Sequence, residues 1–156
     1  MTFSQSKKLT QSEKKDIFHL WNTEYPLMMQ YSNLKQFDDY LNELGDQQHL
    51  LLKDAAGIVK GWYFDFIREG ERWFAALLDS ALHGKGFGTE MLHTAKQKRT
   101  QLNGWVITEK TFKRANGQFY KSPLGFYKKN GFRVLEDTEL VTSKFSAIKI
   151  EWNKVN

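Results

Sequence analysis

The chain contains no cysteine and only two prolines among its 156 residues. Without cysteine, disulfides, cysteine nucleophiles and thiolate metal sites are excluded. Pro26 and Pro123 are isolated, which also excludes a proline-rich linker. No apolar run reaches the roughly 20 residues that cross a bilayer, and residues 1–10 lack the apolar stretch of a signal peptide. We therefore expect a cytoplasmic, soluble protein that makes no contact with membranes.

The composition is that of a folded protein. Hydrophobic residues make up 40% of the chain and aromatic residues 15%, which argues against intrinsic disorder. The length suits a single domain covering residues 1–156. The 23 Lys and Arg against 18 Asp and Glu give a net charge of +5, which favours anionic partners such as phosphates, nucleotides or nucleic acid. Both signs are interspersed, as on an ordinary solvated surface.

The hydrophobic pattern predicts helices and strands in alternation. Thr10 and Glu13 form a capping-box signature before a helix over residues 11–25, and a second helix covers 34–44 with Gly45 to close it. The remaining expected elements are strands over 49–53, 58–67 and 72–79, a helix from 87 to Leu102 ended by Asn103-Gly104, a strand over 105–107, a helix between Ser122-Pro123 and Asn130-Gly131, and strands over 132–136 and 148–152. This order predicts an α/β protein with a mixed sheet and helices on both faces.

Residues 77–89 carry the strongest functional signal, a buried strand followed by a glycine-rich turn and a helix start. Glycines allow positive φ and a close backbone approach, and the free N–H groups of a helix N-terminus attract an anion. The segment therefore predicts a site for phosphate or pyrophosphate. A Walker loop does not fit, because Gly84-Lys85 is followed by Gly86, and a dinucleotide fingerprint does not fit, because Thr89 replaces its third glycine.

Two motifs resemble those of the GNAT superfamily of N-acetyltransferases. Residues 83–88 (His-Gly-Lys-Gly-Phe-Gly) match its acetyl-CoA loop, Gln/Arg-x-x-Gly-x-Gly/Ala, with His83 in the first position. Residues 126–132 (Phe-Tyr-Lys-Lys-Asn-Gly-Phe) match its aromatic-Tyr-x-x-x-Gly-Phe helix end. A purely structural glycine turn and a helix that packs Phe126 and Phe132 into the core are the alternatives. The two motifs stand in the family's order, which favours the resemblance.

The resemblance implies a fold and an activity. The fold would be GNAT-like, with a mostly antiparallel sheet and a splay between two central parallel strands. The activity would be transfer of the acetyl group of acetyl-CoA to a primary amine of a small molecule or peptide, by direct attack in a ternary complex and without a metal. A homodimer is compatible with the family. A domain that binds acetyl-CoA without catalysis is an alternative.

The resemblance also implies site residues. Tyr127 matches the family's general acid, which protonates the leaving thiolate; a hydrogen bond to the sulfur without proton transfer is the alternative. Glu109 is the candidate general base and Asp79 a second candidate, although each could instead be a surface or capping carboxylate. The expected acetyl-CoA contacts are Leu78, Asp79, His83, Gly84, Lys85, Gly86, Phe87, Gly88, Thr89 and Tyr127.

Residues 108–121 depart from the family pattern. The segment is long, Tyr120 stands where the family has asparagine, and Asn116-Gly117 is a strong signal for a two-residue hairpin. We expect either a hairpin that covers the acceptor site or an ordinary basic loop. Its alternation of Lys and Arg with Phe and Tyr resembles a nucleic-acid contact, a rival function without a recognised motif.

One segment gives an indication of the acceptor's chemistry. The family's acceptor loop corresponds to residues 25–31, which are apolar and aromatic without a carboxylate. Polyamines usually require acidic residues, so the loop points away from them. Core packing by Leu27, Met28 and Met29 is the alternative.

Overall fold

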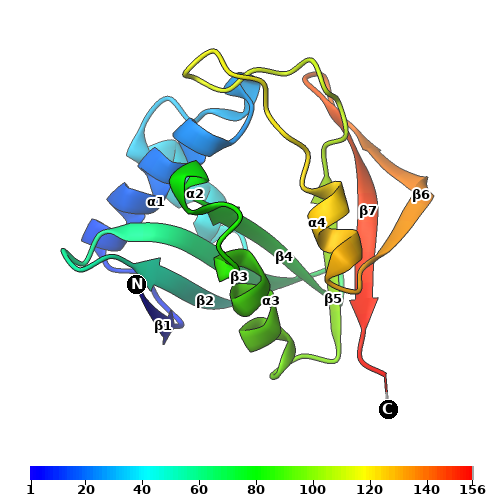
Figure 1. Cartoon of the computed structure of the whole chain (residues 1–156), viewed down its shortest axis with the longest axis horizontal. Coiled ribbons are helices and arrows are strands. Elements are labelled where there is room, and N and C mark those ends of the chain that lie inside the picture. Colours follow the sequence, from blue (N-terminus) through cyan, green and yellow to red (C-terminus); the bar gives the residue numbers. More distant parts are fainter. Residues whose placement is uncertain (156) are drawn as a thin grey trace.

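The computed structural model describes residues 1–155, and its centre is a seven-stranded sheet with helices on both faces (Figure 1). The strands lie in the order β1-β2-β3-β4-β5-β7-β6, and every neighbouring pair is antiparallel except the central pair β4–β5. This confirms the predicted fold class. The elements are β1 Thr2–Ser6, α1 Gln11–Glu24, η1 Leu27–Met29, α2 Leu34–Asn42, β2 Gly45–Lys53, β3 Val59–Arg68, β4 Glu71–Leu78, η2 Ser80–Leu82, α3 Phe87–Lys96, β5 Gln101–Val106, α4 Leu124–Lys129, β6 Arg133–Val141 and β7 Ser146–Asn153.

The two faces of the sheet have separate cores. Successive side chains of a strand point to opposite faces. In β3, Trp62 and Phe64 pack with the apolar side chains of α1 and α2, whereas Tyr63 packs with those of α3 and α4. The predicted capping box of α1 is present, because Thr10 and Glu13 exchange hydrogen bonds between side chains and backbone. Among residues 1–155, no helix has the length and apolar character needed to span a bilayer.

Several predicted boundaries were wrong. The third helix ends at Lys96, and Leu102 and Gly104 belong to β5. Leu102 continued the apolar stripe by coincidence, and Gly104 is required for packing, since a Cβ there would lie 2.8 Å from the Phe74 ring. Gly45 begins β2 rather than closing α2, and α4 begins at Leu124, with Ser122 accepting only a long 3.4 Å bond from the Leu124 N–H.

The first strand was not predicted. Residues 2–6 lack an apolar run, and β1 forms by antiparallel pairing with β2 at the edge of the sheet. Propensity carries little signal for such a strand, because its partner supplies the hydrogen bonds.

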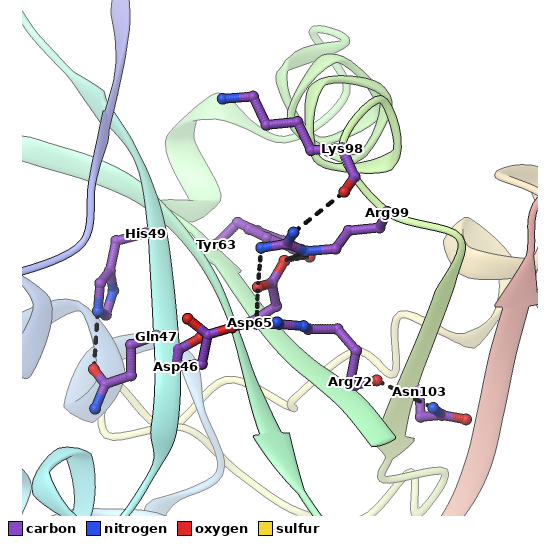
Figure 2. Close-up of polar contacts among 9 residues, drawn as sticks. All are labelled: Asp46, Gln47, His49, Tyr63, Asp65, Arg72, Lys98, Arg99 and Asn103. Atoms are coloured by element: carbon purple, nitrogen blue, oxygen red, sulfur yellow. Dashed lines mark hydrogen bonds and ion pairs between the residues drawn. The ribbon is translucent and has the colours of Figure 1, made fainter. Parts of the chain in front are cut away.

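A polar network closes one end of the central strands (Figure 2). Asp65 is buried and accepts hydrogen bonds from Arg72 at 3.0 Å, from Arg99 at 2.9 and 3.0 Å, and from the Tyr63 hydroxyl at 2.7 Å. Asn103 of β5 donates to the Arg72 carbonyl at 3.1 Å. These contacts tie β3, β4 and β5 together where β4 and β5 begin, which leaves the opposite ends free to separate.

Candidate active site

The parallel strands β4 and β5 separate toward their carboxyl ends. Their register contains one residue pair, Trp73 with Asn103, although both strands continue beyond it. A cavity of about 670 Å³ occupies the splay, lined on its two edges by residues 73–76 and 104–107. The remaining walls come from helices α1, α2 and α4, the end of β3, the β6–β7 hairpin, and the segments that follow α1 and precede α4. The fold therefore places a substrate-sized space at the point where the sheet opens.

Aromatic side chains dominate the cavity. Five of the six tyrosines line it, together with Trp21, Phe66, Trp73, Phe74, Trp105 and Phe145. Burial raises the pKa of Tyr31 and of Tyr120 to about 12, and it raises the pKa values of Tyr25, Tyr40 and Tyr127 further. All five phenols are therefore neutral at physiological pH.

Tyr127 lies where α4 faces the splay. Its ring is buried and makes edge contacts with Phe74 and Phe132, with centroids 5.6 and 5.4 Å away. Within residues 1–155 its hydroxyl has no hydrogen-bond partner, although the residue lines the cavity. A buried phenol without a partner is available to a ligand atom.

The glycine-rich turn after β4 presents a row of free backbone donors. The N–H groups of residues 84–89 have no acceptor in the part of the chain that the structure describes, and the first intrahelical bond of α3 comes from Glu90 to Gly86. Gly84 and Gly86 have φ values of +75° and +87°, which only glycine adopts at low cost. At position 88 glycine is required for a different reason, namely that a Cβ there would lie 2.9 Å from the Phe126 ring. The turn has the donors that an anion requires.

The backbone N–H and carbonyl groups at the end of β4 face either β3 or the splay. The Asp79 N–H donates to the Lys60 carbonyl on β3, and the Asp79 carbonyl accepts from Leu82. In an antiparallel pair, successive residues turn their polar groups to opposite sides, so Leu78 and Ala76 face the splay. The Leu78 carbonyl accepts a hydrogen bond from the His83 ring at 2.9 Å. This geometry favours Ala76 and the Leu78 N–H over Asp79 as backbone contacts for a ligand.

Solved structures share this arrangement. Neither the protein-family models nor the curated proteins include a match to the sequence. An aminoglycoside 6'-N-acetyltransferase complexed with coenzyme A superposes with a TM-score of 0.72 over 100% of this chain and 98% of that one, at 11% identity. A GNAT superfamily phosphinothricin acetyltransferase from Sinorhizobium meliloti in complex with AcCoA gives 0.65 over 98% and 89%, at 10% identity. A spermidine N-acetyltransferase from Vibrio cholerae gives 0.65 over 98% and 95%, at 15% identity.

The chain has the GNAT fold. At these identities the likeness concerns the fold, so the roles of individual residues depend on the geometry of this chain. Tyr127 lines the cavity at the splay, whereas the glycine-rich turn lies between β4 and α3 and is not among the lining residues.

Glu109 lies outside the cavity. Its carboxylate is fully exposed and accepts hydrogen bonds from the Lys110 N–H, the Thr111 N–H and the Thr111 hydroxyl. These donors lower its pKa. Asp79 also lies off this cavity and caps η2 through the Ala81 N–H. Within residues 1–155, the cavity lining contains no carboxylate and no imidazole.

The segment over residues 108–121 forms a short hairpin against α1. Lys113 and Phe119 pair, but the turn has three loop residues instead of the expected two: Gly117 donates to Arg114 with a φ of +83°, and Arg114 donates to Gln118. Arg114 also forms a 2.6 Å ion pair with buried Glu24, and Tyr120 faces the cavity. Two members of the supposed nucleic-acid contact are thus directed inward.

Two groups of site residues were missed from the sequence. Glu24 joins three elements, since it accepts from Arg114 and, at 2.8 Å, from the Ser80 N–H after β4. Arg68 and Lys144 line the cavity from the end of β3 and the β6–β7 hairpin. No sequence motif indicated these charged residues, because partners such as Arg114 and Glu24 are 90 positions apart in the chain and meet only in the folded protein.

Proposed function

We propose that this protein is an N-acetyltransferase that transfers the acetyl group of acetyl-CoA to a primary amine in a ternary complex. The observation that carries the proposal is the combination of a cavity at the splayed β4–β5 pair, onto which the unpartnered Tyr127 hydroxyl opens, with free N–H groups at residues 84–89 in the turn and helix start that follow β4. Coenzyme A or AcCoA is bound in two of the structures that share the fold, which supports the same ligand here.

The residues present fit acetyl-CoA. The N–H groups of the glycine-rich turn and the amino end of α3 would hold the pyrophosphate, with Lys85 adding positive charge. The Ala76 backbone and the Leu78 N–H, on the edge of β4 that faces the splay, would hold the pantetheine arm as an added strand. His83 would contribute indirectly, because its ring bonds to the Leu78 carbonyl and steadies the turn.

The thioester supplies an activated acetyl group, whose C–S bond breaks as the C–N bond to the acceptor amine forms. The Tyr127 hydroxyl would donate a hydrogen bond to the departing sulfur. Because burial raises the pKa of Tyr127, a hydrogen bond that stabilises the thiolate is favoured over complete proton transfer.

The acceptor amine must also lose a proton. We retain Glu109 as the proposed proton acceptor, reached through water, since it is exposed and its lowered pKa keeps it ionised. Glu109→Gln tests this role: a fall in kcat and a changed acid limb of the pH–rate profile support it, whereas an unchanged profile assigns the proton to bulk water.

The binding half of the proposal is tested by Thr89→Glu. Thr89 is the third residue of α3, where a carboxylate stabilises a helix but occupies the N–H groups that an anion would use. We expect acetyl-CoA to bind the wild-type protein with micromolar affinity in isothermal titration, and Thr89→Glu to weaken binding at least tenfold, roughly the value of one charge-assisted contact. The melting temperature should not fall.

Gln97→Glu is the matched control. It makes the same charge change at the exposed carboxyl end of the same helix and should leave acetyl-CoA affinity unchanged. Absence of binding to the wild-type protein would contradict the proposed function. Binding without thiol release for any amine would instead identify a non-catalytic acetyl-CoA-binding domain.

A further inference from the structure

Among residues 1–155, the side chains that line the cavity carry positive charge and no negative charge. Arg68 and Lys144 are the charged residues that line it, and the five phenols are neutral. A third cation, Lys149, lies with its ammonium 5.3 Å from the Trp73 ring centroid, but Glu71 pairs with it at 3.8 Å. An acceptor with several ammonium groups would meet cations and no carboxylate here.

Arg68 is held without an acidic partner. Its guanidinium lies 4.8 Å from the Trp73 ring centroid and 5.4 Å from that of Phe66, so aromatic faces position it. Within residues 1–155 it forms no ion pair or side-chain hydrogen bond, unlike Arg72, Arg99, Arg114 and Arg133. Its five N–H donors are thus free to bind a carboxylate in the two-pronged geometry that guanidinium favours.

The cavity lining near Arg68 is aromatic. The Trp73 and Trp105 rings stack with centroids 5.2 Å apart, and both residues line the cavity, as do Tyr31 and Tyr40. Such a surface suits an apolar or aromatic group.

We propose that the acceptor is an amino acid with an apolar or aromatic side chain, whose carboxylate pairs with Arg68 and whose side chain lies against the Trp73–Trp105 stack. The proposal deepens the proposed function and rests on it for the chemistry. The acceptor's neutral amine attacks the thioester carbonyl, the C–N bond forms and the C–S bond breaks. The amine's proton passes through water to Glu109, and the sulfur leaves as the thiol or thiolate of coenzyme A.

Pairs of amines that differ only in the carboxylate test the proposal. The assay follows the release of coenzyme A thiol from acetyl-CoA. One pair of acceptors is phenylalanine and 2-phenylethylamine, and the other is leucine and 3-methylbutylamine. Spermidine is included as an acceptor with several positive charges and no carboxylate. We expect kcat/KM to be at least about tenfold higher for each amino acid than for its twin, since a charge-assisted pair contributes that much. Arg68→Gln should remove the difference, whereas Lys129→Gln, which loses an exposed charge on α4, should keep it.

A binding measurement separates this proposal from the acetyl-CoA proposal. N-acetylphenylalanine and N-acetyl-2-phenylethylamine are titrated into the protein alone, with the fluorescence of the cavity tryptophans as the signal. Tighter binding of the carboxylate, lost in Arg68→Gln, supports the acceptor class even if acetyl-CoA fails to bind. Equal affinities for the two N-acetyl compounds, or faster acetylation of spermidine than of the amino acids, would overturn the proposed acceptor class. The proposed function would still stand in that case if acetyl-CoA binds.

Discussion

The Tyr127 ring is buried, whereas its hydroxyl has no partner in the described residues and opens onto a cavity. Such a group can bind a ligand atom without first breaking a hydrogen bond within the protein. The helix end that carries it was predicted from seven residues, because Gly131 must adopt a φ of +85° after the helix and Phe132 must then enter the core. The sequence could not show that the hydroxyl lacks a partner, since this depends on residues from elements far apart along the chain.

Tyr127→Phe tests the role of the hydroxyl alone. The ring contacts with Phe74 and Phe132 remain, so the fold and the acetyl-CoA affinity should be retained. We expect kcat to fall about 10²-fold, the usual effect of removing a positioned donor. Because burial raises the pKa of Tyr127, the wild-type pH–rate profile should show no loss of activity from phenol ionisation between pH 7 and 10. An unchanged kcat in the variant would exclude the hydroxyl from the reaction.

At the scale of elements, the hairpin of residues 108–121 is attached to α1 at separate points. The Leu27 N–H donates to the Lys113 carbonyl at 2.8 Å, Arg114 pairs with Glu24, and the Tyr25 and Tyr120 rings lie 6.5 Å apart. Because Glu24 also holds the Ser80 N–H, one buried carboxylate connects α1, the hairpin and the end of β4. We interpret the hairpin as a cover for the acceptor side of the cavity, positioned by Glu24.

Arg114→Gln should release this hairpin. It leaves the buried Glu24 carboxylate without its cation, which commonly costs about 3–5 kcal/mol unless the partner moves into solvent. We expect faster trypsin cleavage within residues 108–121 and a higher acceptor KM, with unchanged acetyl-CoA affinity. The double variant Arg114→Gln with Glu24→Gln has no uncompensated buried charge, so it should be more stable than Arg114→Gln alone. Cleavage at the wild-type rate in Arg114→Gln would mean that the ion pair does not hold the hairpin.

At the scale of the whole molecule, the fold class followed from the sequence, because long apolar runs such as β3 and the capped helix α1 have strong local signals. The boundary between α3 and β5 did not follow, since Leu102 fits the apolar stripe of the helix as well as the core of the strand. The glycine-rich turn could be located from its residues. The charge of the acceptor site could not, because Arg68 and Lys144 lie 76 positions apart and meet only through the fold.

His49 gives the whole molecule a pH-dependent stability. Its ring is buried between strands, stacks on Phe64, accepts from the Trp62 indole at 3.0 Å, and bonds to Gln47. Burial lowers its pKa from 6.5 to about 4, while the charges of Asp65 and Glu13 oppose this shift and that of Lys14 adds slightly to it. The folded state therefore keeps His49 neutral where the unfolded chain is already protonated. Its contribution to stability is complete above pH 6.5 and is lost as the pH falls toward 4.

We expect the free energy of unfolding to fall by about 2 kcal/mol between pH 7 and pH 5, as these two pKa values require. Urea unfolding at pH 7 and pH 5 measures this change in the free energy of unfolding. Both pH values lie above the range in which Glu13 and Asp46 become protonated in the folded protein, because the pKa values of these two carboxyl groups are lowered. His49→Asn keeps an acceptor for the Trp62 indole but cannot titrate, so its lower stability should be nearly the same at both pH values. If the variant lost as much stability as the wild-type protein, the dependence would arise elsewhere. A flat wild-type curve would mean that the folded protein accepts a proton on His49 without cost.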